Sequence, residues 1–98
     1  MPDIVVDAGN EDAPASRPKH TSIGVSGSDF PPGSAVNIKI DPGNHRGTAD
    51  VRPDGRFDFV VSVRPQLKCR TVVTATVHGS DGIVVEGKDS VFCPGDAP

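Results

Sequence analysis

The chain has little of what many functional sites are built from. It contains no Trp and no Tyr, only four Phe, two Cys and one Met among 98 residues. Trp and Tyr dominate binding hot spots and sugar-stacking platforms, so their absence argues against a lectin of the aromatic-platform type. No run approaches the ~20 apolar residues of a membrane span, and no window shows a convincing 3.6-residue period. We therefore expect essentially no helix and no membrane segment.

A concentration of positive charge is also missing. Ten Lys and Arg stand against 13 Asp and Glu, which gives a net charge of -3. No group of basic residues is longer than Arg17, Lys19 and His20, which are not consecutive. A phosphate-binding surface needs clustered Lys and Arg, so we expect no nucleic-acid partner.

The motifs of catalysis and metal binding are absent from the sequence. His20, His45 and His78 lie far apart, with no H-x-x-x-H or Cys/His cluster around them. The carboxylates lack the D-x-D-x-D-G spacing of a calcium loop, and no Ser lies in a G-x-S-x-G motif. We predict neither an enzyme nor a metal or cofactor site, and interpret the histidines and carboxylates as solvated groups.

What the sequence does have is alternation punctuated by turns. Ten Pro and eleven Gly suit a chain with many turns. Apolar residues alternate at period two in three runs, at 36–40, 49–51 and 57–63, which the turn clusters 41–44 and 53–56 separate. Such spacing is typical of short antiparallel strands in a sandwich. The sequence predicts one all-β sandwich domain of about seven strands over residues 20–98, with strands at 21–26, 35–40, 48–52, 57–63, 70–78 and 83–92.

Residues 1–19 differ from the rest and are predicted to form an extended N-terminal arm. Apart from the triplet Ile4-Val5-Val6, they are rich in Asp, Glu, Ala and Pro and bury little apolar surface by themselves. Ile4, Val5 and Val6 can add a strand to a partner's sheet and so act as partner-binding residues. The alternative is that the triplet pairs with an edge of its own sandwich. If the arm only docks, deleting residues 1–19 leaves a folded domain.

The last hairpin is predicted in most detail. The segment Ser80-Asp81-Gly82 suits a three-residue loop that ends with glycine in the left-handed region. Counting outward from Asp81 places Val77 opposite Val85. The same register puts Asp89 opposite Val73 on the apolar face, which a bulge at 87–88 would relieve.

The two cysteines lie on this hairpin. The register centred on Asp81 brings Cys69 opposite Cys93, where β-carbons about 4.5–5.5 Å apart permit a disulfide. Closing this loop contributes on the order of 3 kcal/mol by the chain-entropy estimate. A disulfide also favours an oxidising location.

Three segments together resemble bacterial and bacteriophage immunoglobulin-like domains. They are residues 23–36 (I-G-V-S-G-S-D-F-P-P-G-S-A-V), 52–59 (R-P-D-G-R-F-D-F) and 71–77 (T-V-V-T-A-T-V), the last followed by the turn 79–82. The resemblance covers residues 21–93 and implies an immunoglobulin-like sandwich. The chain departs from antibody domains because it has no core Trp, and its cysteines tie one hairpin instead of two sheets.

The resemblance implies a module that binds, spaces or displays. Met1-Pro2-Asp3-Ile4 lacks the basic and apolar regions of a secretory signal, so a full gene product of this length is expected to be a phage decoration protein on the virion surface. Its partner would be a capsid or tail protein, with several weak attachments or a homo-oligomer acting together. The alternative is a spacer or adhesin domain from a secreted bacterial cell-surface protein, located in the cell wall or outside the cell and binding surface glycans weakly.

Overall fold

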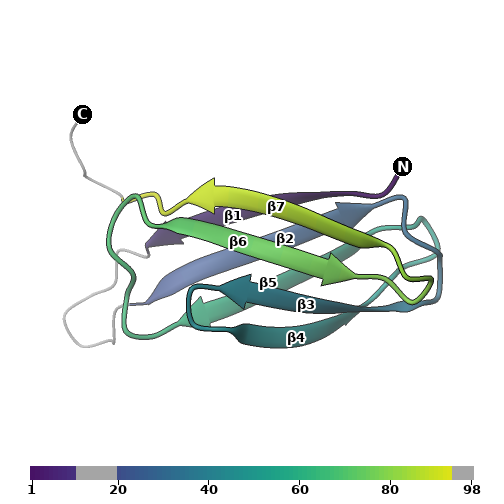
Figure 1. Cartoon of the computed structure of the whole chain (residues 1–98), viewed down its shortest axis with the longest axis horizontal. Helices are drawn as coiled ribbons and strands as arrows, with labels where there is room; N and C mark the ends of the chain where they lie inside the picture. The colour runs from purple at the N-terminus through teal and green to yellow at the C-terminus, as the bar shows by residue number, and fades with distance from the viewer. Residues whose placement is uncertain (11–19, 94–98) are drawn as a thin grey trace.

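The computed structural model describes residues 1–10 and 20–93, and the described chain is all-β. Seven strands form two antiparallel sheets that pack face to face as a sandwich (Figure 1). The strands are β1 (Asp3–Asn10), β2 (Thr21–Ser28), β3 (Ala35–Asp41), β4 (His45–Asp50), β5 (Phe57–Val63), β6 (Val72–His78) and β7 (Val84–Ser90).

The order of the strands is that of an immunoglobulin-like sandwich. One sheet has the order β1-β2-β5 and the other β4-β3-β6-β7. The chain crosses between the sheets after β2, after β4 and again after β5, which gives the Greek-key connections typical of this fold. The predicted fold class is confirmed.

The predicted strand positions agree with the structure for most of the chain. The strand at 57–63 is confirmed at both ends, and the other predictions differ by a few residues. The largest shift is in β4, which begins at His45 because the turn 42–44 is short, with Gly43 and Asn44 at positive φ. It ends at Asp50, and the Val51 amide extends the pairing with β3 by one more bond, to the Ser34 carbonyl.

A small core of branched aliphatic side chains fills the space between the sheets. Val36, Ile38 and Ile40 of β3 alternate inward and are buried. At one end of the core the rings of Phe30 and Phe57 pack edge to face, with centroids 5.2 Å apart. This geometry suits the aromatic quadrupole and anchors the loop before β3.

The structure corrects the prediction of an N-terminal arm. Asp3–Asn10 form β1, which pairs along its whole length with β2. Ile4 and Val6 are each only 8% exposed and belong to the core, whereas Val5 is 66% exposed. The alternative that the triplet pairs with its own sandwich is therefore confirmed, and the rest of the predicted arm, residues 11–19, lies outside the described residues.

Strand β1 also closes the sandwich against β7. Its free edge is met by Asp89, whose carboxylate accepts a hydrogen bond from the Ala8 amide at 2.8 Å. Phe92 continues the contact, with its carbonyl accepting from the Asn10 amide and its own amide donating to the Ala8 carbonyl. Gly87 makes the approach possible, because a Cβ there would lie 3.0–3.2 Å from side-chain atoms of Val6 and Ile4.

The predicted register of the last hairpin is confirmed. Val77 pairs with Val85 and Gly82 has a φ of 87°. Asp89 does pair with Val73, but the predicted bulge at 87–88 is absent. Asp89 needs no such relief, because its carboxylate accepts a hydrogen bond from the Ala8 amide of β1.

The disulfide between Cys69 and Cys93 is present, with the two Cα atoms 5.7 Å apart. Pairing continues beyond the named strands to reach it. The Val91 amide donates to the Thr71 carbonyl, and the Arg70 amide donates to the Val91 carbonyl.

We predict that truncating Ile4 destabilises the domain while truncating Val5 does not. Ile4→Ala removes buried methyl groups between the sheets and is expected to lower the free energy of unfolding by about 2–4 kcal/mol. Val5→Ala on the outer face of the same strand is the matched control, expected within about 0.5 kcal/mol of wild type. Urea unfolding followed by circular dichroism measures both. Equal stability of the two variants would show that β1 is not part of the folded unit.

Candidate binding surfaces

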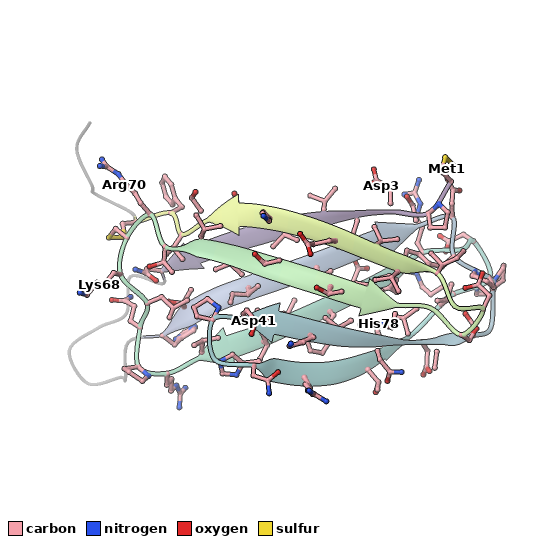
Figure 2. The ribbon with its side chains drawn as sticks, in the orientation of Figure 1. Met1, Asp3, Asp41, Lys68, Arg70 and His78 are labelled. Atoms are coloured by element: carbon pink, nitrogen blue, oxygen red, sulfur yellow. A yellow bond between two sulfur atoms is a disulfide. The ribbon has the colours of Figure 1, made fainter. Side chains whose placement is uncertain are left out.

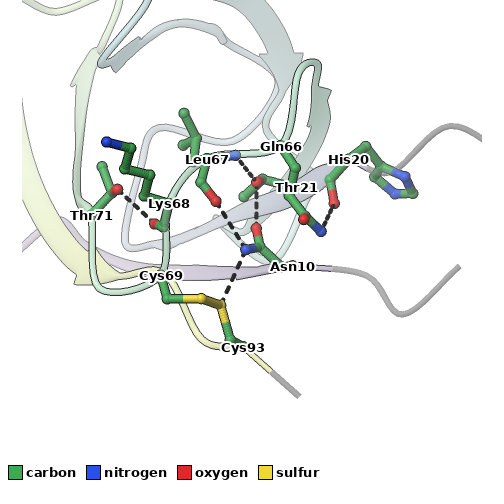
Figure 3. The surroundings of a disulfide bond; sticks show 9 residues. All are labelled: Asn10, His20, Thr21, Gln66, Leu67, Lys68, Cys69, Thr71 and Cys93. Atoms are coloured by element: carbon green, nitrogen blue, oxygen red, sulfur yellow. Dashed lines mark hydrogen bonds between the residues drawn. A yellow bond between two sulfur atoms is a disulfide. The ribbon is translucent and has the colours of Figure 1, made fainter. Parts of the chain in front are cut away.

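A buried polar cluster lies beside the disulfide, where β1 ends and β2 begins (Figure 3). Thr21 and Asn10 are the buried polar residues of the described chain. The Thr21 hydroxyl donates to Asn10 Oδ1 at 2.5 Å, and it accepts from the Leu67 amide at 2.8 Å. Asn10 Nδ2 donates to the Leu67 carbonyl at 2.9 Å.

These hydrogen bonds form a closed ring through the backbone N–H and C=O of one residue, Leu67. Asn10 Nδ2 also lies 3.2 Å from Cys93 Sγ, so the cluster joins β1, β2, the loop before β6 and the disulfide. No buried side-chain N or O atom of the described residues lacks a partner. With no free group aimed at a cavity, the cluster serves to hold the fold and offers nothing to a ligand.

The outer face of the three-stranded sheet is the first candidate binding surface. Its central strand, β2, presents only small side chains outward, while Ile23 and Val25 point into the core. Val5 on one side and Val60 on the other stand above this floor and are 66% and 68% exposed. The outward residues of β2 are Ser22, Gly24, Ser26 and Ser28.

Phe92 adds an aromatic ring beside this face. It is 67% exposed and follows the end of β7, next to Gly9. A shallow depression of about 450 Å³ has the exposed Asp7 and the small residues Gly9, Ser22 and Gly24 among its lining residues, together with Val60 and Phe92. We call the surface formed by Val5, Val60 and Phe92 over the small residues of β2 the valine face.

The outer face of the four-stranded sheet is largely polar, apart from the exposed Val72 and Val84, and forms the second candidate. A wider open depression of about 750 Å³ lies over β4, β3 and the end of β6. Figure 2 shows His78 on this side of the molecule, with Lys68 and Arg70 at the end of the sandwich opposite Met1 and Asp3. The polar side chains of the depression are Asn37, Lys39, Arg46, Thr48 and His78.

An ion pair marks the edge of the valine face. Arg52 Nη1 donates to Asp58 Oδ2 at 2.8 Å, and the Ser26 hydroxyl donates to Asp58 Oδ1 at 3.0 Å. The hydrogen bond from Arg52 is the main reason that the pKa of Asp58 lies below its usual 3.8, and the bond from Ser26 adds to it. Both charged groups are exposed, so water screens the pair and it mainly fixes the carboxylate in place.

The described residues contain no cluster suited to a metal. No group of three or more His, Cys, Asp or Glu side chains converges in residues 1–10 and 20–93. The same residues include no helix of the length and apolar character needed to cross a membrane.

The predicted site residues are separated by the structure. Ile4 and Val6 lie in the core, so their predicted role in binding a partner is wrong, because each side chain is covered by the opposite sheet. Val5 alone of the triplet remains accessible. Val60 and Phe92 do not follow from the sequence pattern, although Val60 is an apolar residue at an outward position of the correctly predicted strand 57–63.

In comparisons with known proteins, no protein-family model and no curated protein matches the chain. The resemblance of residues 21–93 to bacterial and phage immunoglobulin-like domains therefore stays a prediction from their motifs, and the observed order of the strands is compatible with it. The fold alone does not assign a function.

We predict that Asn10 and Thr21 are energetically coupled. Asn10→Ala removes a hydrogen-bond partner from the Thr21 hydroxyl and from the Leu67 carbonyl. Thr21→Val removes a partner from the Asn10 side chain and from the Leu67 amide. Each is expected to cost about 1–3 kcal/mol, and the double variant less than the sum of the two. Ser26→Ala, which removes an exposed hydrogen bond, is the control with little effect. Strictly additive losses in chemical unfolding would contradict the ring.

Proposed function

We propose that this chain is a non-enzymatic structural and binding module, a virion decoration protein that docks on a phage capsid or tail protein and displays an immunoglobulin-like sandwich. The observation that carries the proposal is the valine face. Two exposed valines and one exposed phenylalanine surround a floor of Ser and Gly. Exposed apolar groups gathered on one side of a small domain are typical of a protein-binding surface.

The valine face suits a flat protein partner better than a small molecule. Its floor is shallow because the outward side chains of β2 are serines and glycine, so another sheet or helix can approach the backbone closely. Val5, Val60 and Phe92 then become buried, each contributing roughly 1.5–3 kcal/mol before the costs of association. A surface with three such anchors binds weakly by itself, which fits a protein present in many copies on a particle.

Two further features support the proposal of a virion surface. The motifs of residues 23–36, 52–59 and 71–77 resemble domains found as appendages of capsid and tail proteins. The Cys69–Cys93 disulfide persists in an oxidising environment such as the outside of a virion or cell.

The alternative is a spacer or adhesin domain of a secreted bacterial cell-surface protein. The specific observation in its favour is the polar depression on the four-stranded sheet. Asn37, Thr48 and His78 offer hydrogen-bonding groups and Lys39 and Arg46 offer positive charge. Such a surface suits weak contacts with glycans, although it holds no aromatic ring for sugar stacking.

Co-sedimentation with undecorated phage particles tests the proposal. The double variant Val5→Ser/Phe92→Ser is expected to lose most binding, since both changes remove apolar contacts from the valine face. The matched control is Val72→Ser/Val84→Ser, which replaces two exposed valines of the four-stranded sheet and is expected to bind as wild type. Both doubles alter exposed side chains, and a thermal melt by circular dichroism confirms folding.

Two outcomes would overturn the proposal. One is that the wild-type chain fails to co-sediment with the particles. The other is that both double variants bind equally well. Loss of glycan binding on a cell-wall polysaccharide array after Lys39→Ala, with the valine-face variant unaffected, would favour the alternative.

A further inference from the structure

The four sheet edges of the sandwich are not equally protected. The free edge of β1 is covered by Asp89 and Phe92, and β7 lies along β1 on its own outer side. Edge strand β4 carries His45, Arg46 and Asp50 within six residues. In β5 the residues F-D-F-V-V-S-V include one charged side chain and no Pro. An edge of this kind readily pairs with another strand.

Alternate residues of a strand point their backbone N–H and C=O groups to opposite sides, and this alternation shows which backbone groups of β5 are free. Ala8 and Asn10 of β1 bond outward to Asp89 and Phe92, so the even-numbered residues of β1 face away from β2. The odd residues of β1 therefore bond β2, and their partners are the even residues of β2. Because hydrogen-bonded and non-hydrogen-bonded pairs alternate in an antiparallel sheet, the odd residues of β2 bond the odd residues of β5. The amides and carbonyls of Asp58, Val60 and Ser62 therefore face the open edge.

No described residue takes up these groups. Strand β5 pairs only with β2 in residues 1–10 and 20–93, and no backbone bond of Asp58, Val60 or Ser62 to a loop is present there. The nearest strand of the other sheet is β4, where the Phe59 ring lies over Gly47 so closely that a Cβ at residue 47 would collide with it. This ring and the neighbouring Val61 are only partly buried.

We propose that two copies of this chain pair through their β5 strands, antiparallel, about a two-fold axis at Val60. In this register Val60 faces Val60 of the second copy, and Asp58 faces Ser62. The three even residues of each copy meet as hydrogen-bonded pairs, which satisfies the backbone groups that the monomer leaves open. The seven residues of β5 overlap completely, and any shift along the strand shortens the overlap.

The side chains are complementary to themselves in this register. On the inner side Phe59 comes opposite Val61 of the second copy, and Phe57 opposite Val63. Aromatic and β-branched residues form favourable cross-strand pairs, and these two would cover the part of Phe59 and Val61 that the monomer exposes. Arg56 of each copy comes opposite Arg64 of the other, one residue beyond each end of β5.

Asp58, the single charged residue of β5, disfavours one alternative register. Shifting the axis to Asp58 would place two carboxylates opposite each other, and one of these is already fixed by Arg52 and Ser26. Like charges directly opposed destabilise an antiparallel pair. The self-complementary pattern is the reason that we assign the edge to a second copy and not to an unrelated strand.

The dimer would have one six-stranded sheet with the order β1-β2-β5-β5-β2-β1. A two-fold axis through a hydrogen-bonded pair is perpendicular to the sheet, so both outer faces lie on the same side. If the valine face docks as proposed above, the dimer presents two such faces to one particle and gains avidity. The pairing itself rests on β5 and does not depend on that function.

A charge-swap experiment at Val60 tests the dimer. Val60→Lys and Val60→Glu place like charges across the axis and are each expected to raise the dissociation constant of the dimer about tenfold or more. An equimolar mixture of the two variants restores a dimer, because Lys then faces Glu. Sedimentation equilibrium measures the rise from the 10.2 kDa chain mass to twice that value as concentration increases.

The matched controls are Val84→Lys and Val84→Glu on exposed β7, which should associate as wild type does. A wild-type chain that stays monomeric at millimolar concentration overturns the proposal, as does a mixture of Val60 variants that dimerises no better than either alone. Tighter association of Val60→Lys by itself would also overturn it, because it would mean that residue 60 faces Asp58. A docking failure with an intact dimer would instead count against the valine face.

Discussion

The structure depends on the closure of the sandwich by its first strand. Without β1, the β2 edge and the inner face of β7 would lie open. With it, Ile4 and Val6 fill the space above Gly87 and the outward amides of Ala8 and Asn10 find acceptors in Asp89 and Phe92. The buried ring that begins at Asn10 then fixes the loop before β6 next to the disulfide. Strand β1 therefore contributes to the core, covers its own edge and contacts the disulfide through Asn10.

The same strand decides which surfaces are available for function. Because side chains alternate along a strand, burying Ile4 and Val6 commits Val5 to solvent on the side where Val60 and Phe92 also lie. Covering the edges of β1 and β7 leaves β5 as the weakly protected edge. The valine face and the proposed β5 pairing are therefore both consequences of how the N-terminal residues are used, and a free docking arm would have produced neither.

Local patterns in the sequence predicted the parts of the fold that depend on local chemistry. The turn at 80–82 set the register of β6 and β7, and the alternation of residues 57–63 defined β5 without error. The position of β1 could not be predicted in the same way, since a triplet of β-branched residues pairs equally well with its own sheet or a neighbour's. The role of Asp89 cannot be predicted from local patterns either, because its partner, the Ala8 amide, is distant in sequence. The valine face was missed because Val5, Val60 and Phe92 come together only in three dimensions.

Hydrogen exchange at the Ala8 and Asn10 amides shows directly whether β1 closes the sandwich. These are the two β1 amides that point away from β2 and bond to Asp89 and Phe92, so only a closed sandwich protects them. If β1 closes the sandwich, both amides exchange as slowly as core amides such as Val25 in β2, and they lose this protection only on global unfolding. Exchange of Ala8 and Asn10 at the rate of an unstructured peptide, in a chain whose β2 amides stay protected, would contradict it.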